Sequence, residues 1–322
     1  MRQIILDFSK QFNIGLEAAS SVKASGKFKR VIVCGMGGSA LPGEILKAWV
    51  SQSKINFPIL VSKEYNLPLS ATKESLICVI SYSGNTAEPL SAYLEAQRKH
   101  LPVVAIASGG ELLELCSQNK TPLAVVPEGI PSRSAVGYQT AALFQILINS
   151  KIIPNCTDDV RLLSRELKSK GLEKQGKGIA KKIKNKTPII YSSLSNKALA
   201  YVWKVNFNES SKIPAFYNYF PEANHNELSG FENTRNFYVL ILKDPKEDPR
   251  IISRMKLTQE IIKKEGVESE IIKLSGKNVF SKLFRGVLLG LWASYYLALE
   301  RKVDPSAVRL QDELKNRLKN HK

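Results

Sequence analysis

A cluster of hydroxyl side chains in the segment Ser81-Tyr82-Ser83-Gly84-Asn85-Thr86 is the first feature of the chain that could do chemistry. The segment follows the apolar run 76–80 and precedes a helical pattern over 87–98, which predicts a turn between a buried strand and a helix. Free N–H groups at the start of a helix bind anions, and nearby hydroxyls would complete a phosphate site. A Ser/Thr-rich helix cap without any ligand would have the same residues.

A second turn of this kind comes earlier, at Gly35-Met36-Gly37-Gly38-Ser39-Ala40, between a predicted strand over 30–34 and a helical pattern over 41–50. Gly37 and Gly38 would let the backbone approach a ligand closely, and Ser39 adds a hydroxyl. Ligands of open parallel sheets bind at the carboxyl ends of the strands, so both turns can face one pocket. The six candidate phosphate-binding residues are therefore Gly37, Gly38, Ser39, Ser81, Ser83 and Thr86.

Two charged residues could act on a substrate bound there. Arg133 lies in a loop after a predicted strand over 122–126, again at the carboxyl end of the first sheet, where it could hold an anionic oxygen. Glu209 ends a helical pattern that contains Trp203 and Phe207, and a partly apolar wall would make its carboxylate a stronger base. Alternatively, Glu209 is a surface residue that pairs with Lys212.

His225 is a third candidate, in the segment Pro221-Glu222-Ala223-Asn224-His225-Asn226-Glu227. The other two histidines, His100 and His321, lie in a polar helix end and in the tail. His225 is either an acid–base group oriented by its neighbours or a solvated loop residue. No second His lies near it and no cysteine pair has ligand spacing, so the sequence predicts no metal site.

The composition is that of a globular protein: 322 residues, 43% hydrophobic and 24% charged. No apolar run is long enough to span a bilayer and the first residues lack a signal-peptide pattern, so we expect a cytoplasmic protein without membrane contact. The four cysteines are expected to be reduced core residues. The net charge of +18 comes from lysine runs without interleaved aromatics, which argues against a nucleic-acid partner.

Strand and helix patterns alternate along the chain, which predicts an α/β fold with parallel sheets and right-handed crossovers. Helical spacing over 1–25 is expected to cover the first sheet. We expect an N-terminal domain over 1–153, a Lys-rich helical connection over 154–186 and a second α/β domain with a C-terminal helix over 187–322. Further strands are predicted at 58–62, 76–80, 102–107, 188–192, 237–242 and 268–274, and further helices at 135–150, 197–208, 250–265 and 279–299.

The turn at 35–40 also satisfies the dinucleotide-binding pattern G-x-G-x-x-G/A. That pattern needs an acidic residue at the end of the next strand, and the sequence has Lys63 there, with Glu64 following. A nucleotide-dependent oxidoreductase is therefore a weak alternative.

Taken together, these segments resemble a known family. The two turns resemble the phosphosugar-binding signatures of sugar isomerase (SIS) domains. With Pro131-Ser132-Arg133, the run Asn208 to Lys212 and the run Asn224 to Glu227, nearly the whole chain resembles the bifunctional phosphoglucose/phosphomannose isomerases of the phosphoglucose isomerase superfamily. The resemblance implies two SIS-type subdomains, each flavodoxin-like with three αβα layers and a parallel sheet.

The resemblance also implies a reaction and roles. An aldose-ketose isomerase of this family interconverts glucose 6-phosphate and mannose 6-phosphate with fructose 6-phosphate, without metal or cofactor, by ring opening and a cis-enediol(ate) proton transfer. By this resemblance the serines and Thr86 hold the phosphate, Glu209 is the base, Arg133 stabilises the enediolate and His225 opens the ring from the neighbouring subunit of a homodimer. Lys315, in the tail segment Asp312 to Leu318, corresponds to a second ring-opening residue, with Lys319 as an alternative.

Three alternatives stay open within this frame. The chain could be a phosphosugar isomerase of narrower specificity, because the sequence does not place the side chains that decide between epimers at C2. It could be a non-catalytic phosphosugar-binding sensor, although only about 25 residues precede the first sheet, too few for a DNA-binding module. An amino-sugar synthase would need an N-terminal cysteine-nucleophile domain.

Overall fold

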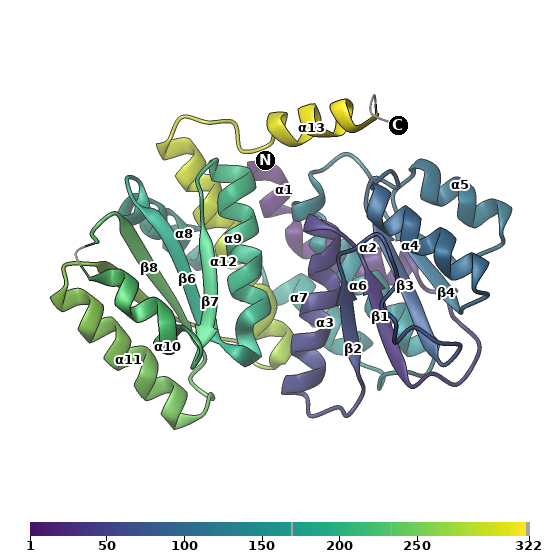
Figure 1. Ribbon diagram of the computed structural model, residues 1–322, viewed down its shortest axis with the longest axis horizontal. Coiled ribbons are helices and arrows are strands. Elements are labelled where there is room, and N and C mark those ends of the chain that lie inside the picture. The colour runs from purple at the N-terminus through teal and green to yellow at the C-terminus, as the bar shows by residue number, and fades with distance from the viewer. Residues whose placement is uncertain (169, 233, 320–322) are drawn as a thin grey trace.

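The computed structural model describes residues 1–168, 170–232 and 234–319. It contains two parallel β-sheets, each flanked by helices, side by side in the molecule (Figure 1). The N-terminal half holds a five-stranded sheet in the order β2-β1-β3-β4-β5, and the C-terminal half a four-stranded sheet in the order β7-β6-β8-β9. The predicted α/β fold with parallel sheets is confirmed.

The central strands of the first sheet are buried on both faces, as expected for parallel strands with crossover helices. Every residue of β3 is buried, from Ser75 to Ser81. From β1 the chain crosses to one side of the sheet to form β2, and from β2 it returns to the other side of β1 to form β3. The strand order therefore reverses between the neighbouring strands β1 and β3. Doubly wound folds bind their ligands at such a point. The elements of this half are β1 (Arg30–Cys34), α3 (Leu41–Gln52), β2 (Ile59–Ser62), β3 (Ser75–Ser81), α4 (Ala87–Arg98), β4 (Val103–Ala107), α5 (Gly110–Gln118), β5 (Leu123–Val125) and α6 (Val136–Asn149).

The N-terminal segment forms three short helical pieces in place of one long helix: α1 (Arg2–Leu6), η1 (Phe8–Lys10) and α2 (Gln11–Ala18). Helix α2 packs closely on α6 at Gly15, where an added Cβ would lie 2.4 Å from the carbonyl oxygen of Tyr138. The N-terminal segment was predicted to cover the first sheet, and in the structure it packs on α6.

The second sheet repeats the strand order of the first four strands of the N-terminal sheet. Strand β7 was missed by the sequence analysis, because a five-residue aromatic edge strand, Phe216–Phe220, lacks an alternating pattern. The elements of this half are β6 (Thr187–Ser193), α9 (Lys197–Ser211), β7, α10 (Ala223–Asn226), η5 (Glu227–Phe231), β8 (Phe237–Lys243), α11 (Pro249–Lys264), β9 (Glu268–Lys273) and α12 (Val279–Glu300).

Two helices, α7 (Thr157–Glu166) and α8 (Lys170–Ile183), form the connection between the halves. Helix α8 packs along α12, where a Cβ on Gly176 would lie 2.5 Å from the Cβ of Trp292. The domain boundaries at 153/154 and 186/187 remain predictions.

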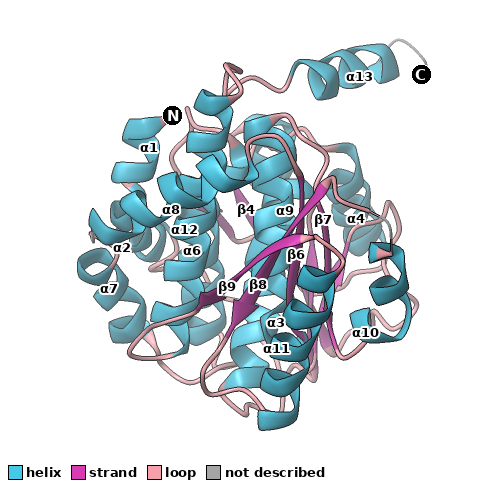
Figure 2. Ribbon diagram, turned by 90° about the vertical axis from the view of Figure 1, so that its left-hand side faces the viewer, coloured by secondary structure: helices cyan, strands magenta, loops and turns pink. Residues whose placement is uncertain are grey.

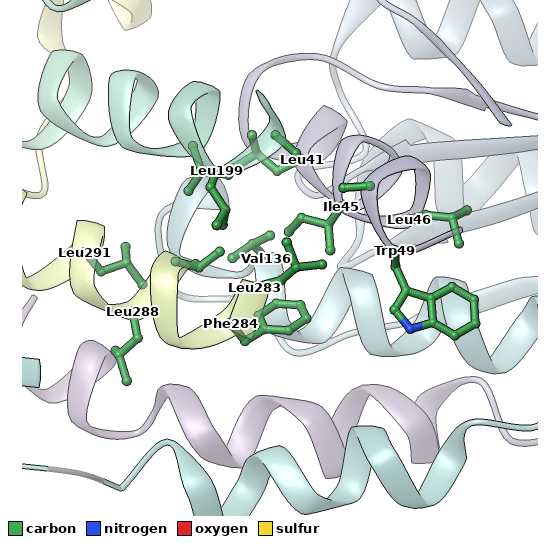
Figure 3. Close-up of a cluster of buried hydrophobic side chains, with 14 of the residues drawn as sticks. Leu41, Ile45, Leu46, Trp49, Val136, Leu199, Leu283, Phe284, Leu288 and Leu291 are labelled. Atoms are coloured by element: carbon green, nitrogen blue, oxygen red, sulfur yellow. The ribbon is translucent and has the colours of Figure 1, made fainter. Parts of the chain in front are cut away.

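One continuous hydrophobic core joins the two halves. Helices α3, α6, α9 and α12 contribute to it side by side, and Figure 3 shows their side chains meeting. The labelled members are Leu41, Ile45, Leu46, Trp49, Val136, Leu199, Leu283, Phe284, Leu288 and Leu291. Burial of this size holds the halves in one fixed arrangement.

The carboxyl ends of the two sheets point toward opposite ends of the molecule. Helix α3 starts beside the carboxyl end of β1 and finishes at Gln52, whose amide donates a 2.7 Å hydrogen bond to the carbonyl oxygen of Ser195, just past the carboxyl end of β6. Helix α9 starts there and returns to the carboxyl edge of the first sheet. The end of α9 and the end of β7 therefore lie on opposite sides of the molecule (Figure 1).

The last helix, α13 (Arg309–Lys319), stands away from the rest of the chain in both views (Figures 1 and 2). In the described part of the chain, no helix combines the length and the apolar character that crossing a bilayer would require.

Candidate active site

The two predicted phosphate loops meet in space. They follow the neighbouring strands β1 and β3, and the backbone N–H of Tyr82 donates a 3.0 Å hydrogen bond to the hydroxyl of Ser39. The Ser39 hydroxyl also lies 3.3 Å from that of Ser132, in the short helix η3 (Ser132–Ser134) after β5. Three loops of the first sheet thus converge at its carboxyl edge.

The hydroxyls of the second loop are not used for helix capping. Thr86 is the residue before α4 and has an extended backbone, but its side chain caps no N–H of that helix. The hydroxyl of Ser81 is buried and has no hydrogen-bond partner among the described residues. Ser83 is exposed, and its oxygen accepts a 3.3 Å hydrogen bond from the N–H of Asn85. The Ser83 and Thr86 hydroxyls are therefore within reach of a ligand, whereas the Ser81 hydroxyl is closed off from solvent in this arrangement.

Two glycines hold these loops tightly together. A Cβ on Gly38 would lie 2.5 Å from the backbone nitrogen of Arg133, so only glycine lets the first loop pack against η3. Gly84 has φ +70°, and a Cβ there would lie 1.8 Å from the carbonyl oxygen of Gly109.

Arg133 and Glu209 form an ion pair next to these loops. The Arg133 guanidinium donates from one terminal nitrogen to the Glu209 carboxylate at 3.1 Å and from Nε to the Ser210 hydroxyl at 3.0 Å. The carboxylate pairs with Arg133, whereas Lys212 donates to the backbone oxygen of Glu209. The Glu209 side chain is 25% exposed and can be reached from solvent.

The segment between α12 and α13 covers the arginine. The second terminal nitrogen of Arg133 donates to the carbonyl oxygens of Pro305 at 2.5 Å and Ser306 at 3.4 Å. Lys212 donates to the carbonyl oxygen of Ala307 at 2.5 Å. As a result Arg133 is only 2% exposed.

Burial shifts the pKa values of Arg133 and Lys212. Burial lowers the pKa of Arg133, and the Glu209 carboxylate opposes that shift. The ordinary pKa of arginine is so high that the guanidinium stays charged. Burial also lowers the pKa of Lys212, and the neighbouring Arg133 charge lowers it further. The site therefore places a permanent cation against a solvent-reachable carboxylate.

The other two predicted catalytic residues, His225 and Lys315, lie apart from the Arg133–Glu209 pair in the structure. His225 is exposed on α10, after the carboxyl end of β7, and so lies on the side of the molecule opposite Arg133. Lys315 is exposed on α13, whose first residue comes two positions after Ala307. For Lys319 the structure describes the backbone alone, and His321 lies outside the described residues.

Sequence reasoning missed several members of the cluster. Ser132 and Ser210 adjoin predicted residues, and that adjacency was the available signal. The sequence holds no signal for the carbonyl oxygens of Pro305 and Ser306, because every residue type has the same backbone carbonyl group. Among the described residues, no three His, Cys, Asp or Glu side chains gather closely enough to share a metal ion.

The fold defines the class. The C-terminal domain of glucosamine-fructose-6-phosphate aminotransferase from Francisella tularensis superposes with a TM-score of 0.73, at 16% identity, over 95% of this chain and 98% of that one. Residues 172–318 match the family described as bacterial phospho-glucose isomerase C-terminal SIS domain. The chain has the two-sheet α/β fold of SIS phosphosugar proteins.

Sequence relatives narrow the class to one family. The bifunctional phosphoglucose/phosphomannose isomerase of Caldicellulosiruptor bescii is 34% identical over 325 residues, covering 96% of this chain and 95% of that protein. That of Aquifex aeolicus is 33% identical over 91% of this chain and 92% of its own length. The chain belongs to the bifunctional phosphoglucose/phosphomannose isomerases, a family of enzymes.

Proposed function

We propose that this chain is an aldose-ketose isomerase that interconverts glucose 6-phosphate and mannose 6-phosphate with fructose 6-phosphate. The observation that carries the proposal is the Arg133–Glu209 ion pair beside two phosphate-type loops, in a chain of this family. We place the enzyme in the cytoplasm, in the sugar-phosphate steps of glycolysis and gluconeogenesis. The four free, buried cysteines support a reducing compartment.

Glu209 is the base of the proposed mechanism. With the ring open, its carboxylate takes the proton from C2 and returns it to C1, while the hydroxyl proton of O2 passes to O1, which converts the aldose into the ketose. A single base suffices for both aldoses if rotation about the C2–C3 bond turns either face of the planar enediol toward Glu209. Solvent access to Glu209 supports this role.

Arg133 stabilises the enediolate in this proposal. A fixed cation acts most strongly where water is excluded, and Arg133 is held by Glu209, Ser210 and the 305–306 carbonyls before any substrate arrives. No metal or cofactor is invoked, because the arginine supplies the positive charge.

The 6-phosphate is assigned to the two loops. Ser39, Ser81, Ser83 and Thr86 donate hydroxyl hydrogens to it, and Gly37 and Gly38 let the backbone approach. The Ser81 hydroxyl supports this assignment, because buried polar groups ordinarily have partners and the described part of the chain offers it none. The net charge of +18 favours encounter with an anionic substrate.

Ring opening requires two further groups, and we assign His225 and Lys315. Because His225 lies on the opposite side of the molecule from Arg133, it would have to come from a second copy of the chain, which makes the proposed enzyme a homodimer. Lys315 would act after α13 moves toward the site.

A coupled assay for fructose 6-phosphate, started from glucose 6-phosphate and separately from mannose 6-phosphate with EDTA present, tests the proposal. Turnover of both substrates supports the bifunctional, metal-free reaction. Turnover of one alone would leave an isomerase of narrower specificity. Binding of both without turnover would favour a phosphosugar sensor.

A further inference from the structure

We propose that Glu227 is a positioning residue that fixes the segment carrying His225. The inference rests on the proposed function, since His225 matters only if the chain opens sugar rings. Glu227 lies outside the Arg133–Glu209 cluster and does not touch the substrate in this proposal. Its loss should nevertheless impair the reaction.

Two side chains from neighbouring strands converge on the Glu227 carboxylate. The Tyr191 hydroxyl of β6 donates to Oε2 at 2.6 Å, and the Asn218 amide of β7 donates to Oε1 at 2.5 Å. Tyr191 and Asn218 are direct partners in the register of the two strands. The sheet therefore presents two donors side by side to one carboxylate.

These donors are firmly held. Tyr191 is 1% exposed and its ring packs against Phe220 and Phe231, with centroids 5.7 Å and 6.4 Å away. Burial raises the pKa of Tyr191, and its hydrogen bond to the Glu227 carboxylate raises it further, so the hydroxyl stays a donor. Hydrogen bonds to an ionised acceptor are stronger than neutral ones.

The rest of the segment has two further hydrogen bonds, one to α11 and one on the surface within the segment itself. On the residue before His225, the Asn224 amide donates to the Thr258 hydroxyl of α11 at 2.7 Å. On the residue after it, the Asn226 amide donates to the Glu222 carboxylate at 2.9 Å. Glu227 is the one of these anchors that reaches the sheet, while His225 itself remains exposed. The segment is thus built as a fixed platform with the histidine directed outward.

Both oxygens of Glu227 are engaged, so its contribution is geometric. Replacing it with glutamine removes the charge and one of the two acceptor oxygens. The amide then either turns its NH2 toward the NH2 of Asn218 or turns it toward the Tyr191 hydroxyl, which must accept instead of donate. Both orientations lose the charge-assisted hydrogen bonds and should loosen the platform. In the double variant E227Q/N218D, the new aspartate accepts from the glutamine NH2 and restores the arrangement.

The test compares kcat and KM of the full-length enzyme on glucose 6-phosphate for wild type, E227Q, E227Q/N218D and the control E232Q, an exposed carboxylate in the next segment. We expect E227Q to lower kcat about tenfold, a part of the roughly 10²–10⁴-fold that an acid–base group contributes, with KM within twofold. The double variant should recover most of kcat, and E232Q should match wild type.

Repeating E227Q in an H225A background distinguishes a role that acts through His225 from a purely structural role of Glu227. A positioning residue acts through His225, so we expect no further loss of kcat there. An equal loss in both backgrounds, or an unchanged kcat in E227Q when H225A is impaired, would overturn the inference. If E227Q does not fold, Y191F removes one donor and takes its place in the same comparison. A wild-type enzyme that turns over no hexose phosphate would instead refute the isomerase proposal itself.

Discussion

Arg133 is the residue that assembles the site. Its guanidinium contacts the end of α9 through Glu209 and Ser210, and the segment after α12 through Pro305 and Ser306. Such a set of partners needs the planar fork of five donors that arginine alone provides. Lysine could not replace it, because an ammonium group cannot reach partners in these directions at once.

The phosphate loops give a prediction for a single hydroxyl. Changing Ser83 to alanine should raise KM for both sugar phosphates about fivefold, the value of one hydrogen bond worth about 1 kcal/mol, with kcat little changed. The 6-phosphate takes no part in the chemistry, so its contact is equally strong before and during the reaction.

Initial-rate kinetics with the control Ser117→Ala, an exposed serine of α5, check this prediction. An unchanged KM in Ser83→Ala would remove Ser83 from the phosphate site.

At the scale of elements, the sequence predicted long apolar strands better than short edge strands. β1, β3 and β4 begin and end within one residue of their predicted limits, because buried parallel strands are continuous apolar runs. β7 escaped detection because its place is decided by pairing with β6, a contact distant in sequence. The break of residues 1–25 into three pieces likewise follows from packing against α6 and α12.

The surroundings of Gly176 and Gly178 in α8 predict opposite effects of a glycine-to-alanine substitution on the free energy of unfolding. Gly176→Ala should destabilise the protein by about 1–3 kcal/mol, because the new methyl group meets Trp292 and the backbone nitrogen of Ala293 at 2.9 Å. Gly178→Ala should stabilise it by about 0.5–1 kcal/mol, because its Cβ would meet nothing within 4 Å and alanine favours the helix.

Urea unfolding followed by circular dichroism measures both changes in the free energy of unfolding. Equal effects of the two substitutions would show that α8 does not pack on α12 as described.

At the scale of the whole molecule, the candidate site was only partly predictable. The loops could be assigned from sequence because strand-turn-helix units put them at one edge of the sheet. That Glu209 would meet Arg133 could not be derived from spacing, since it depends on the reversed direction of the second sheet and on the length of α9. The resemblance to a family supplied both residues, whereas the contacts of the 305–307 carbonyls came from the structure.

The buried cysteines predict how stability depends on pH. Burial raises the pKa of Cys34 and Cys156 to about 12 and that of Cys116 to about 11. An unfolded thiol ionises near pH 8.5, so these residues stabilise the fold fully below that pH, and the contribution is lost as pH rises toward the folded values. We expect the urea midpoint to fall between pH 7.5 and pH 9.5.

Thiol labelling at pH 8.5 provides the matching check. The native protein should react with none of its four thiols and the urea-unfolded protein with all of them. Rapid labelling of the native protein, or a constant urea midpoint, would contradict the buried, neutral state of these residues.

Proton transfer by Glu209 is the central claim, and isomerisation of fructose 6-phosphate in D2O tests it most directly. NMR would follow both the aldose products and the deuterium gained at C1 and C2, for wild type, Glu209→Gln and the control Glu232→Gln. We expect wild type and control to form deuterated glucose and mannose 6-phosphates, and Glu209→Gln to bind the sugar phosphate but lose about 10²–10⁴-fold in rate. Isomerisation by Glu209→Gln at the wild-type rate would contradict this claim.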